Sequence, residues 1–297
     1  MAAPRISVVV RAKDKIDSIG ETLAALRRQS VAAEVIVVDS GSTDGTLDVA
    51  ERWADRVIRI PAESFSYGRA LNIGAQAATA PVHAALSAHC VPESDTWLED
   101  SLRQYERSDV AATNSALVSP VGTPIQGTYW QSLEDVVVDP TWGFSNHAST
   151  WRADVWADQP FREDLVACED KEWSWRVLAA GWTIAYAPEL AAPATHRRSA
   201  GLKPLYQRIT REAQAMVSMG AAEPLAARGA MYAWWSSFPS PSPKPKFIRR
   251  ASPYRIVELA GAWRGSRLTT DVAAPRLPDL LAESGRGYPA EPYIPWF

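Results

Sequence analysis

The stretch Val37–Thr46, with the sequence VVDSGSTDGT, is the strongest structural signal in this chain. It continues the β-branched run Val35–Val38, ends that run at the carboxylate of Asp39, and then turns through small and polar residues. Runs of this kind are typical of the central strands of a parallel sheet. Ser42 or Thr43 can cap the helix expected after the turn. The stretch therefore predicts a strand–turn–helix unit with Asp39 at the carboxyl end of the strand.

The segments around this stretch repeat the alternation of strand and helix. Further strands are expected at Ile6–Val10, Arg56–Ile60 and Val82–Ser87, and helices at residues 18–28, from residue 46 onwards and at residues 67–78. Strands separated by helices of this length predict a doubly wound, mostly parallel α/β sheet. Ligands of such sheets bind at the carboxyl ends of the strands, which places Asp39 and Ser87–His89 at the expected site. We also expect the Asp39 carboxylate, at a strand end, to lie outside the core.

The composition is that of an ordinary globular protein of 297 residues, with 46% hydrophobic and 22% charged residues. Its formal charge of −3 offers no basic field for nucleic acid. The cysteines Cys90 and Cys168 are too few for a disulfide framework or a cysteine-only zinc site. The uncharged stretches at residues 70–92 and 110–132 contain prolines and polar residues, and the N-terminus lacks signal-peptide anatomy. We therefore expect a cytoplasmic protein without a transmembrane segment.

Three further motifs follow in order along the chain: Phe65–Ala75 (FSYGRALNIGA), Leu86–Pro92 (LSAHCVP) and Cys168–Arg176 (CEDKEWSWR). Each motif alone has a purely structural explanation: a helix-capping residue in the first, a polar histidine in the second and acids at a helix N-terminus in the third. In this order, and after VVDSGSTDGT, they resemble the inverting family 2 glycosyltransferases of the GT-A fold, rhamnosyltransferases among them. The resemblance extends from Ile6 to about Thr210. It implies an α/β domain of the GT-A fold, a Rossmann-like and mostly parallel sheet flanked by helices, with a helical or irregular C-terminal extension.

The resemblance also implies a donor, a nucleotide-diphosphate sugar linked to UDP, TDP or GDP. Asp39 would hold the base or ribose, and Arg69 the diphosphate, because a cation at a helix N-terminus suits a pyrophosphate. The residues that it places against the donor are Val10, Arg11, Asp39, Ser40, Arg69, Asn72, Ser87 and Ala88.

A divalent metal, Mn or Mg, is implied at the LSAHCVP motif. The family usually has Asp-X-Asp here, whereas this chain has Ser87-Ala88-His89. Imidazole suits Mn better than Mg, and His196 stands where related enzymes often have a further histidine near the metal. His89 and His196 are therefore the candidate ligands, and a histidine with ordinary hydrogen bonds is the alternative.

The Glu169–Asp170 pair marks the implied catalytic site. Inverting transfer is a single displacement in which an acceptor hydroxyl attacks the anomeric carbon and a carboxylate takes its proton. The family's second carboxylate is that base, which carries over to Asp170 with Glu169 beside it. Trp142, Asn146 and Trp151 are the candidates for the acceptor wall, although most tryptophans in such a domain belong to the core.

The chain is expected to divide into a nucleotide-sugar-binding half at residues 1–115, a catalytic and acceptor-binding half at residues 116–222, and an extension at residues 223–297. Pro239–Lys246 (PSPSPKPK) is a linker, and helices are expected at Leu202–Met219 and Pro253–Trp263. The apolar tail of the extension should pack on the catalytic domain or on a second subunit, as in a homodimer.

Two other functions remain open. A non-catalytic nucleotide-sugar-binding protein is compatible with the altered Asp-X-Asp. A sugar nucleotidyltransferase shares the α/β core but needs a glycine-rich basic loop after the first strand, where residues 11–16 read RAKDKI.

Overall fold

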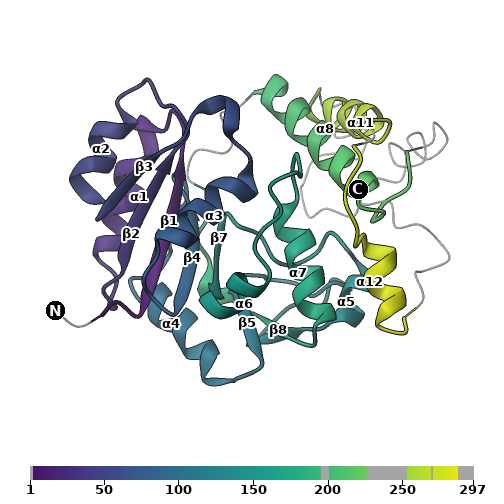
Figure 1. Cartoon of the computed structure of the whole chain (residues 1–297), viewed down its shortest axis with the longest axis horizontal. Coiled ribbons are helices and arrows are strands. Elements are labelled where there is room, and N and C mark those ends of the chain that lie inside the picture. Colours follow the sequence, from purple (N-terminus) through teal and green to yellow (C-terminus); the bar gives the residue numbers. More distant parts are fainter. Residues whose placement is uncertain (1–2, 195–200, 226–252, 269, 287–297) are drawn as a thin grey trace, which may run out of the picture. The chain divides into compact units, whose positions relative to one another are not determined.

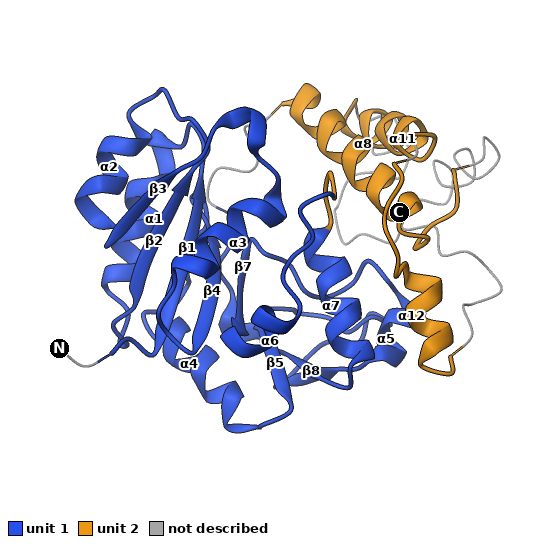
Figure 2. Cartoon of the chain, viewed as in Figure 1, with its two compact units in different colours: residues 1–164, 169–197 blue, residues 165–168, 198–297 orange. Residues whose placement is uncertain are grey.

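The computed structural model describes residues 3–194, 201–225, 253–268 and 270–286. The chain splits into two compact units, residues 1–164 with 169–197 and residues 165–168 with 198–297 (Figure 2). The predicted functional division at residues 115 and 222 stays a prediction. His196, the Pro239–Lys246 linker and the aromatic C-terminal end lie outside the described residues.

The described part of the first unit contains one eight-stranded sheet with the order β3-β2-β1-β4-β7-β5-β8-β6 (Figure 1). The strands are β1 Ile6–Ala12, β2 Glu34–Asp39, β3 Arg56–Arg59, β4 Val82–Ser87, β5 Val110–Asn114, β6 Tyr129–Gln131, β7 Ala148–Arg152 and β8 Thr183–Tyr186. The first four are parallel, as predicted. Strand β7 is antiparallel to both β4 and β5, and β6 is antiparallel to β8, so the sheet as a whole is mixed. Strands β5, β6 and β7 were not predicted, because their sequences VAATN, YWQ and ASTWR lack a long β-branched run.

Helices cover both faces of this sheet. In the first unit they are α1 Ile16–Arg27, α2 Thr46–Trp53, α3 Tyr67–Ala77, α4 Trp97–Arg103, α5 Leu133–Val138, α6 Ala153–Asp158 and α7 Glu169–Ala179. Val8 and Val10 of β1 share a core cluster with residues of α1, α2 and α4. Val9 points to the opposite face, where a Cβ on Gly74 of α3 would lie 2.3 Å from its Cγ1. The alternation of side chains along β1 thus assigns one set of helices to each face.

The carboxyl ends of the central strands meet at one edge of the sheet. Ala12 at the end of β1 pairs with Asp39 at the end of β2, and Arg11 pairs with Ser87 at the end of β4. The antiparallel β7 begins beside them, because Ala148 pairs with Leu86. The loops after β1, β2 and β4 and the segment before β7 therefore gather at this edge.

The described part of the second unit contains the helices α8 Leu202–Ser218, α11 Pro253–Gly265 and α12 Leu277–Glu283. The first two agree with the predicted helices at 202–219 and 253–263, whereas α12 was not predicted. Helices α8 and α11 pack closely because α11 has glycine at the contact. A Cβ on Gly265 would lie 2.1 Å from the Thr210 carbonyl oxygen, and one on Gly261 would lie 3.1 Å from that of Tyr206. Nowhere in the described residues is a helix long and apolar enough to span a bilayer.

Gly68 provides a test of how closely α3 approaches the segment before α7. A Cβ at Gly68 would lie 2.1 Å from the Arg162 carbonyl oxygen, so Gly68→Ala must displace backbone. We expect a loss of about 1–3 kcal/mol in the free energy of unfolding, measured by urea denaturation. Gly20→Ala is the matched helical control, since its Cβ would only reach ordinary contact at 3.8 Å from Val49. Alanine there should stabilise by about 0.5–1 kcal/mol. Equal effects of both substitutions would contradict the close approach.

Candidate active site

Asp39 holds the turn that follows β2. Its Oδ2 accepts the backbone N–H groups of Gly41 and Ser42, both at 3.0 Å, and its Oδ1 accepts the Ser42 hydroxyl. The side chain is therefore buried, with 1% of the residue exposed. The expectation that this carboxylate lies outside the core is wrong, because the turn folds back over it and uses its oxygens.

The loop after β1 and the turn after β2 are tied together. The Asp14 carboxylate accepts the Thr43 N–H at 2.9 Å, and the Asp14 N–H donates to the Ser42 hydroxyl at 2.9 Å. From the other side, the Asp44 carboxylate accepts the Ile16 N–H at 3.1 Å. These reciprocal bonds fix the two loops at the edge where the strands end.

Arg11, one residue before the end of β1, reaches across the same edge. Its Nη2 donates to the Asn146 carbonyl oxygen at 2.8 Å, and its Nη1 lies 3.6 Å from Oε1 of Glu169. The guanidinium also lies 5.5 Å from the ring centroid of Tyr67. Arg11 thus joins β1 to the segment before β7 and to the start of α7.

Glu169 and Asp170 begin α7, as the sequence predicted, but their environments differ. Glu169 is 5% exposed, and burial, followed by the negative charge of Asp170, raises its pKa to about 7 despite the nearby Arg11 guanidinium. Asp170 is half-buried, and its carboxylate accepts the backbone N–H groups of Asn146 at 3.1 Å and Lys171 at 2.8 Å. Of the two carboxylates, Asp170 is the one that a ligand in solvent can reach.

The segment before β7 is held in place by Lys171. Its ammonium donates to the carbonyl oxygens of Gly143 at 2.8 Å and Phe144 at 2.7 Å. Gly143 has φ of 100°, and a Cβ there would lie 2.7 Å from the Tyr186 hydroxyl, so the position requires glycine. Lys171 was missed by the sequence analysis, in which it was only a neighbour of the acid pair.

The three proposed acceptor residues occupy different places. Trp142 is half-buried, donates from its indole to the Val118 carbonyl oxygen at 3.0 Å and packs 4.5 Å from the Tyr186 ring. Asn146 is 1% exposed, and both its backbone and its side chain are hydrogen-bonded within the protein. Trp151 is fully buried against Phe161, with ring centroids 5.2 Å apart, so it forms part of the core.

Some of the residues predicted to contact the sugar donor are buried or hydrogen-bonded within the protein. Val10 is fully buried in β1, Ser40 is 3% exposed, and the Ala88 carbonyl oxygen accepts the Ser18 hydroxyl at 2.8 Å. Asn72 uses all four of its hydrogen-bonding positions within the protein. Its Oδ1 accepts from Trp156 and from the Phe161 N–H, and its Nδ2 donates to the Phe161 carbonyl and to Glu163. The side chains of these residues shape the edge, and their part in donor binding stays a prediction.

Arg69, by contrast, is at the surface. It lies in the first turn of α3, its side chain is 47% exposed, and its Nη1 is 3.2 Å from Oε2 of Glu163. A surface pair of this kind contributes little to stability, so the guanidinium can exchange Glu163 for another anion at small cost.

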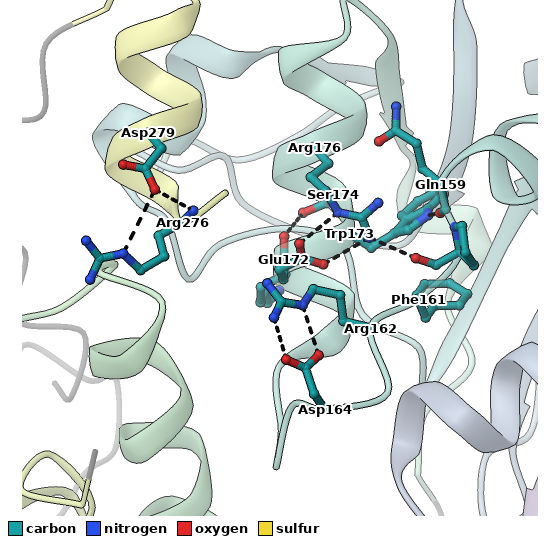
Figure 3. A network of polar contacts seen from close by, with 12 residues as sticks. Gln159, Phe161, Arg162, Asp164, Glu172, Trp173, Ser174, Arg176, Arg276 and Asp279 are labelled. Atoms are coloured by element: carbon teal, nitrogen blue, oxygen red, sulfur yellow. Dashed lines mark hydrogen bonds and ion pairs between the residues drawn. The ribbon is translucent and has the colours of Figure 1, made fainter. Parts of the chain in front are cut away.

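Helix α7 is anchored by polar contacts along its inner side (Figure 3). Glu172, 2% exposed, pairs with Arg176 at 2.7 Å, and Arg176 also donates to the Pro160 carbonyl oxygen at 2.9 Å. The Trp173 indole donates to the Gln159 carbonyl oxygen at 2.7 Å. These bonds fix α7, and with it the position of Asp170, against the segment after α6.

The described residues do not assemble a metal site. No group of three or more His, Cys, Asp or Glu side chains that could hold a metal occurs among them. Ser87, at the end of β4, donates its N–H to the His147 carbonyl oxygen at 2.8 Å. The backbone of Cys90 pairs with that of Ala194 in an isolated antiparallel β-bridge. His89 is the described candidate, while His196 falls in the segment that the structure does not describe.

The mixed sheet, with parallel strands β3-β2-β1-β4 and helices on both faces, has the architecture of the GT-A fold. A solved mannosyltransferase from Pyrobaculum calidifontis, PcManGT in complex with GDP-Man and Mn²⁺, matches with a TM-score of 0.56 and 19% identity, covering 100% of this chain and 78% of that one. The S. aureus protein TarS (residues 1–349) with UDP-GlcNAc matches with a TM-score of 0.53 and 18% identity, covering 72% of this chain and 66% of that one. Glucosyl-3-phosphoglycerate synthase from Mycobacterium tuberculosis, with Mn²⁺, UDP and glucosyl-3-phosphoglycerate, has a TM-score of 0.53 and 16% identity, covering 72% and 78%.

The sequence comparisons point the same way. The model of glycosyl transferase family 2 matches residues 7–149, which are just under half of the chain. Glycosyltransferase AglE of Haloferax volcanii is 26% identical over 201 residues, which are 63% of this chain. The match spans 66% of that relative, just under two thirds of its length.

The raised pKa of Glu169 makes stability depend on pH. Between pH 4.5 and about 7 the folded protein keeps a proton on Glu169 that the unfolded chain releases, so stability falls as pH rises through this window. We expect the free energy of unfolding to fall by up to about 3 kcal/mol more in the wild type than in Glu169→Gln, measured by urea denaturation between pH 4.5 and 8. Parallel pH dependences of the two proteins would contradict the raised pKa.

Proposed function

We propose that this protein is an inverting glycosyltransferase that moves a hexosyl or deoxyhexosyl group from a nucleotide-diphosphate sugar to an acceptor hydroxyl. The observation that carries the proposal is the half-buried Asp170 carboxylate, held by two backbone N–H groups at the carboxyl edge of the sheet. The family match to residues 7–149, which contain the donor-side motifs, supports the nucleotide-sugar donor.

The donor is proposed to lie over the ends of β1, β2 and β4. The turn that Asp39 organises would receive the base and ribose, and Ser87 and His89 would line the same edge. Arg69 would neutralise the diphosphate, because it is an exposed cation at the N-terminus of α3. UDP, TDP and GDP are the candidate nucleotides.

Asp170 is proposed as the general base. Its two N–H donors orient the carboxylate and leave lone pairs on both oxygens to accept the proton of an acceptor hydroxyl. Attack opposite the leaving nucleotide in a single displacement inverts the anomeric configuration. Trp142, half-buried beside Tyr186, is the proposed contribution to the acceptor wall.

Mn²⁺ accompanies the nucleotide or sugar nucleotide in two of the solved structures above. A divalent metal, Mn or Mg, is proposed to help neutralise the diphosphate, with His89 and His196 as its candidate ligands. A non-catalytic nucleotide-sugar-binding protein is the alternative, and turnover distinguishes it from a transferase.

Asp170→Asn tests the base. We expect the affinity for the donor nucleotide to stay within about threefold and turnover to fall by about 10²-fold or more, because the amide cannot take a proton. Turnover is measured as nucleotide release from a panel of nucleotide sugars, and product configuration by NMR.

Asp154→Asn is the matched control. Asp154 is also an acid in the first turn of a helix whose Oδ1 accepts the next N–H, at 2.9 Å, but it is exposed on α6. It should keep full turnover. Normal turnover of Asp170→Asn, or a product with retained configuration, would refute the mechanism. Wild-type protein that binds nucleotide sugars without turnover would favour the alternative.

Arg69→Met tests the diphosphate contact. We expect the Kd for UDP, TDP or GDP, whichever binds, to rise by about tenfold in calorimetry, because a charge-assisted contact to the diphosphate is lost. Arg59→Met is the control, since Arg59 also forms an exposed pair with a glutamate, Glu51, and its side chain is 64% exposed. Equal affinities of the two variants would remove Arg69 from the donor site.

A further inference from the structure

Arg11 differs from the exposed cation Arg69 at the same edge. Its side chain is 13% exposed, against 47% for Arg69. Its charge faces a carboxylate at the start of α7, the buried Glu169 at 3.6 Å. Of its two terminal nitrogens, Nη2 is hydrogen-bonded to the protein, whereas the buried Nη1 faces Glu169 without a hydrogen bond among the described residues.

The contacts of Arg11 lead to Asp170 through one residue. Nη2 of Arg11 holds the carbonyl oxygen of Asn146, and the N–H of the same Asn146 donates to Oδ2 of Asp170. The Asn146 side chain donates to Glu169 Oε1 at 3.5 Å, the oxygen that Arg11 also faces. Asn146 is therefore contacted from both sides, by Arg11 at its carbonyl oxygen and by Asp170 at its N–H.

We propose that Arg11 is a positioning residue for the base Asp170 and not a ligand of the donor diphosphate. The inference rests on the proposed function, because it concerns the carboxylate assigned there as the base. To reach a diphosphate, the guanidinium would have to leave the Asn146 carbonyl and a buried carboxylate, and each group left without its partner is costly to bury. Arg69 can reach a diphosphate without leaving a buried group unpaired, because its partner Glu163 is exposed.

The first experiment separates positioning from donor binding. Arg11→Met should lower kcat by about tenfold or more while the Kd for the nucleotide diphosphate stays within about threefold, because general-base catalysis depends on the geometry of the carboxylate. Arg11→Lys should recover part of kcat, since an ammonium can still donate to the Asn146 carbonyl. Circular dichroism and thermal unfolding confirm that each variant folds.

Arg56→Met is the matched control. Arg56 makes the same kind of contacts at the opposite edge of the sheet, donating to the Ala77 carbonyl oxygen at 2.9 Å and facing Glu34 at 3.7 Å. It should leave kcat unchanged. A rise of tenfold or more in the nucleotide Kd of Arg11→Met with unchanged kcat, the pattern expected of Arg69→Met, would overturn the inference.

A double-mutant comparison tests whether Arg11 acts through Asp170. In Asp170→Asn the base is gone, so adding Arg11→Met should reduce the remaining turnover by no more than about twofold. Losses that multiply would show an independent role and overturn the inference.

An NMR measurement judges the inference even if the chain transfers no sugar, which would refute the proposed function alone. Asp170→Asn should shift the Asn146 amide resonance, because the N–H then loses its carboxylate acceptor. This shift should occur in the wild-type and Arg56→Met backgrounds and be lost in the Arg11→Met background. An equal shift in the Arg11→Met background would overturn the positioning role.

Discussion

Two backbone hydrogen bonds of Asn146 hold together three elements that are far apart in the sequence. Its carbonyl oxygen accepts from Arg11 on β1, and its N–H donates to Asp170 on α7. Asn146 itself belongs to the segment before β7, the strand inserted between β4 and β5. Asn146 therefore links the end of β1 to the acid pair at the start of α7.

Charged groups around Asn146 are buried at a cost that their pairing offsets. Glu169 faces Arg11, and on the next turn of α7 Glu172 pairs with Arg176. Buried pairs of this kind add little net stability, but losing one partner is strongly destabilising, so they favour a single geometry. In this protein that geometry fixes α7 and the direction of its first carboxylates.

The polar side chains at the carboxyl edge of the sheet fall into two groups. Some are hydrogen-bonded within the protein, and others remain accessible to a ligand. Asp39 and Asn72 use their polar atoms to hold a turn and the 156–163 segment. Arg69 and Asp170 keep part of their side chains in solvent. A rigid edge with a few accessible charged groups suits binding and proton transfer, because the free energy needed to reorganise such a site around a ligand is small.

The sequence alone determined the elements whose signal is local. The β-branched runs predicted β1 and β2, and the Glu169–Asp170 pair was correctly placed at a helix start, because strand and helix periodicity depend on residues within a few positions of each other. Only the tertiary structure decided that β7 runs antiparallel beside β4, that Asp39 is buried by its own turn, and that Arg11 meets Asn146, 135 residues away. Such contacts depend on the packing of whole elements against one another, which no local pattern of residues specifies.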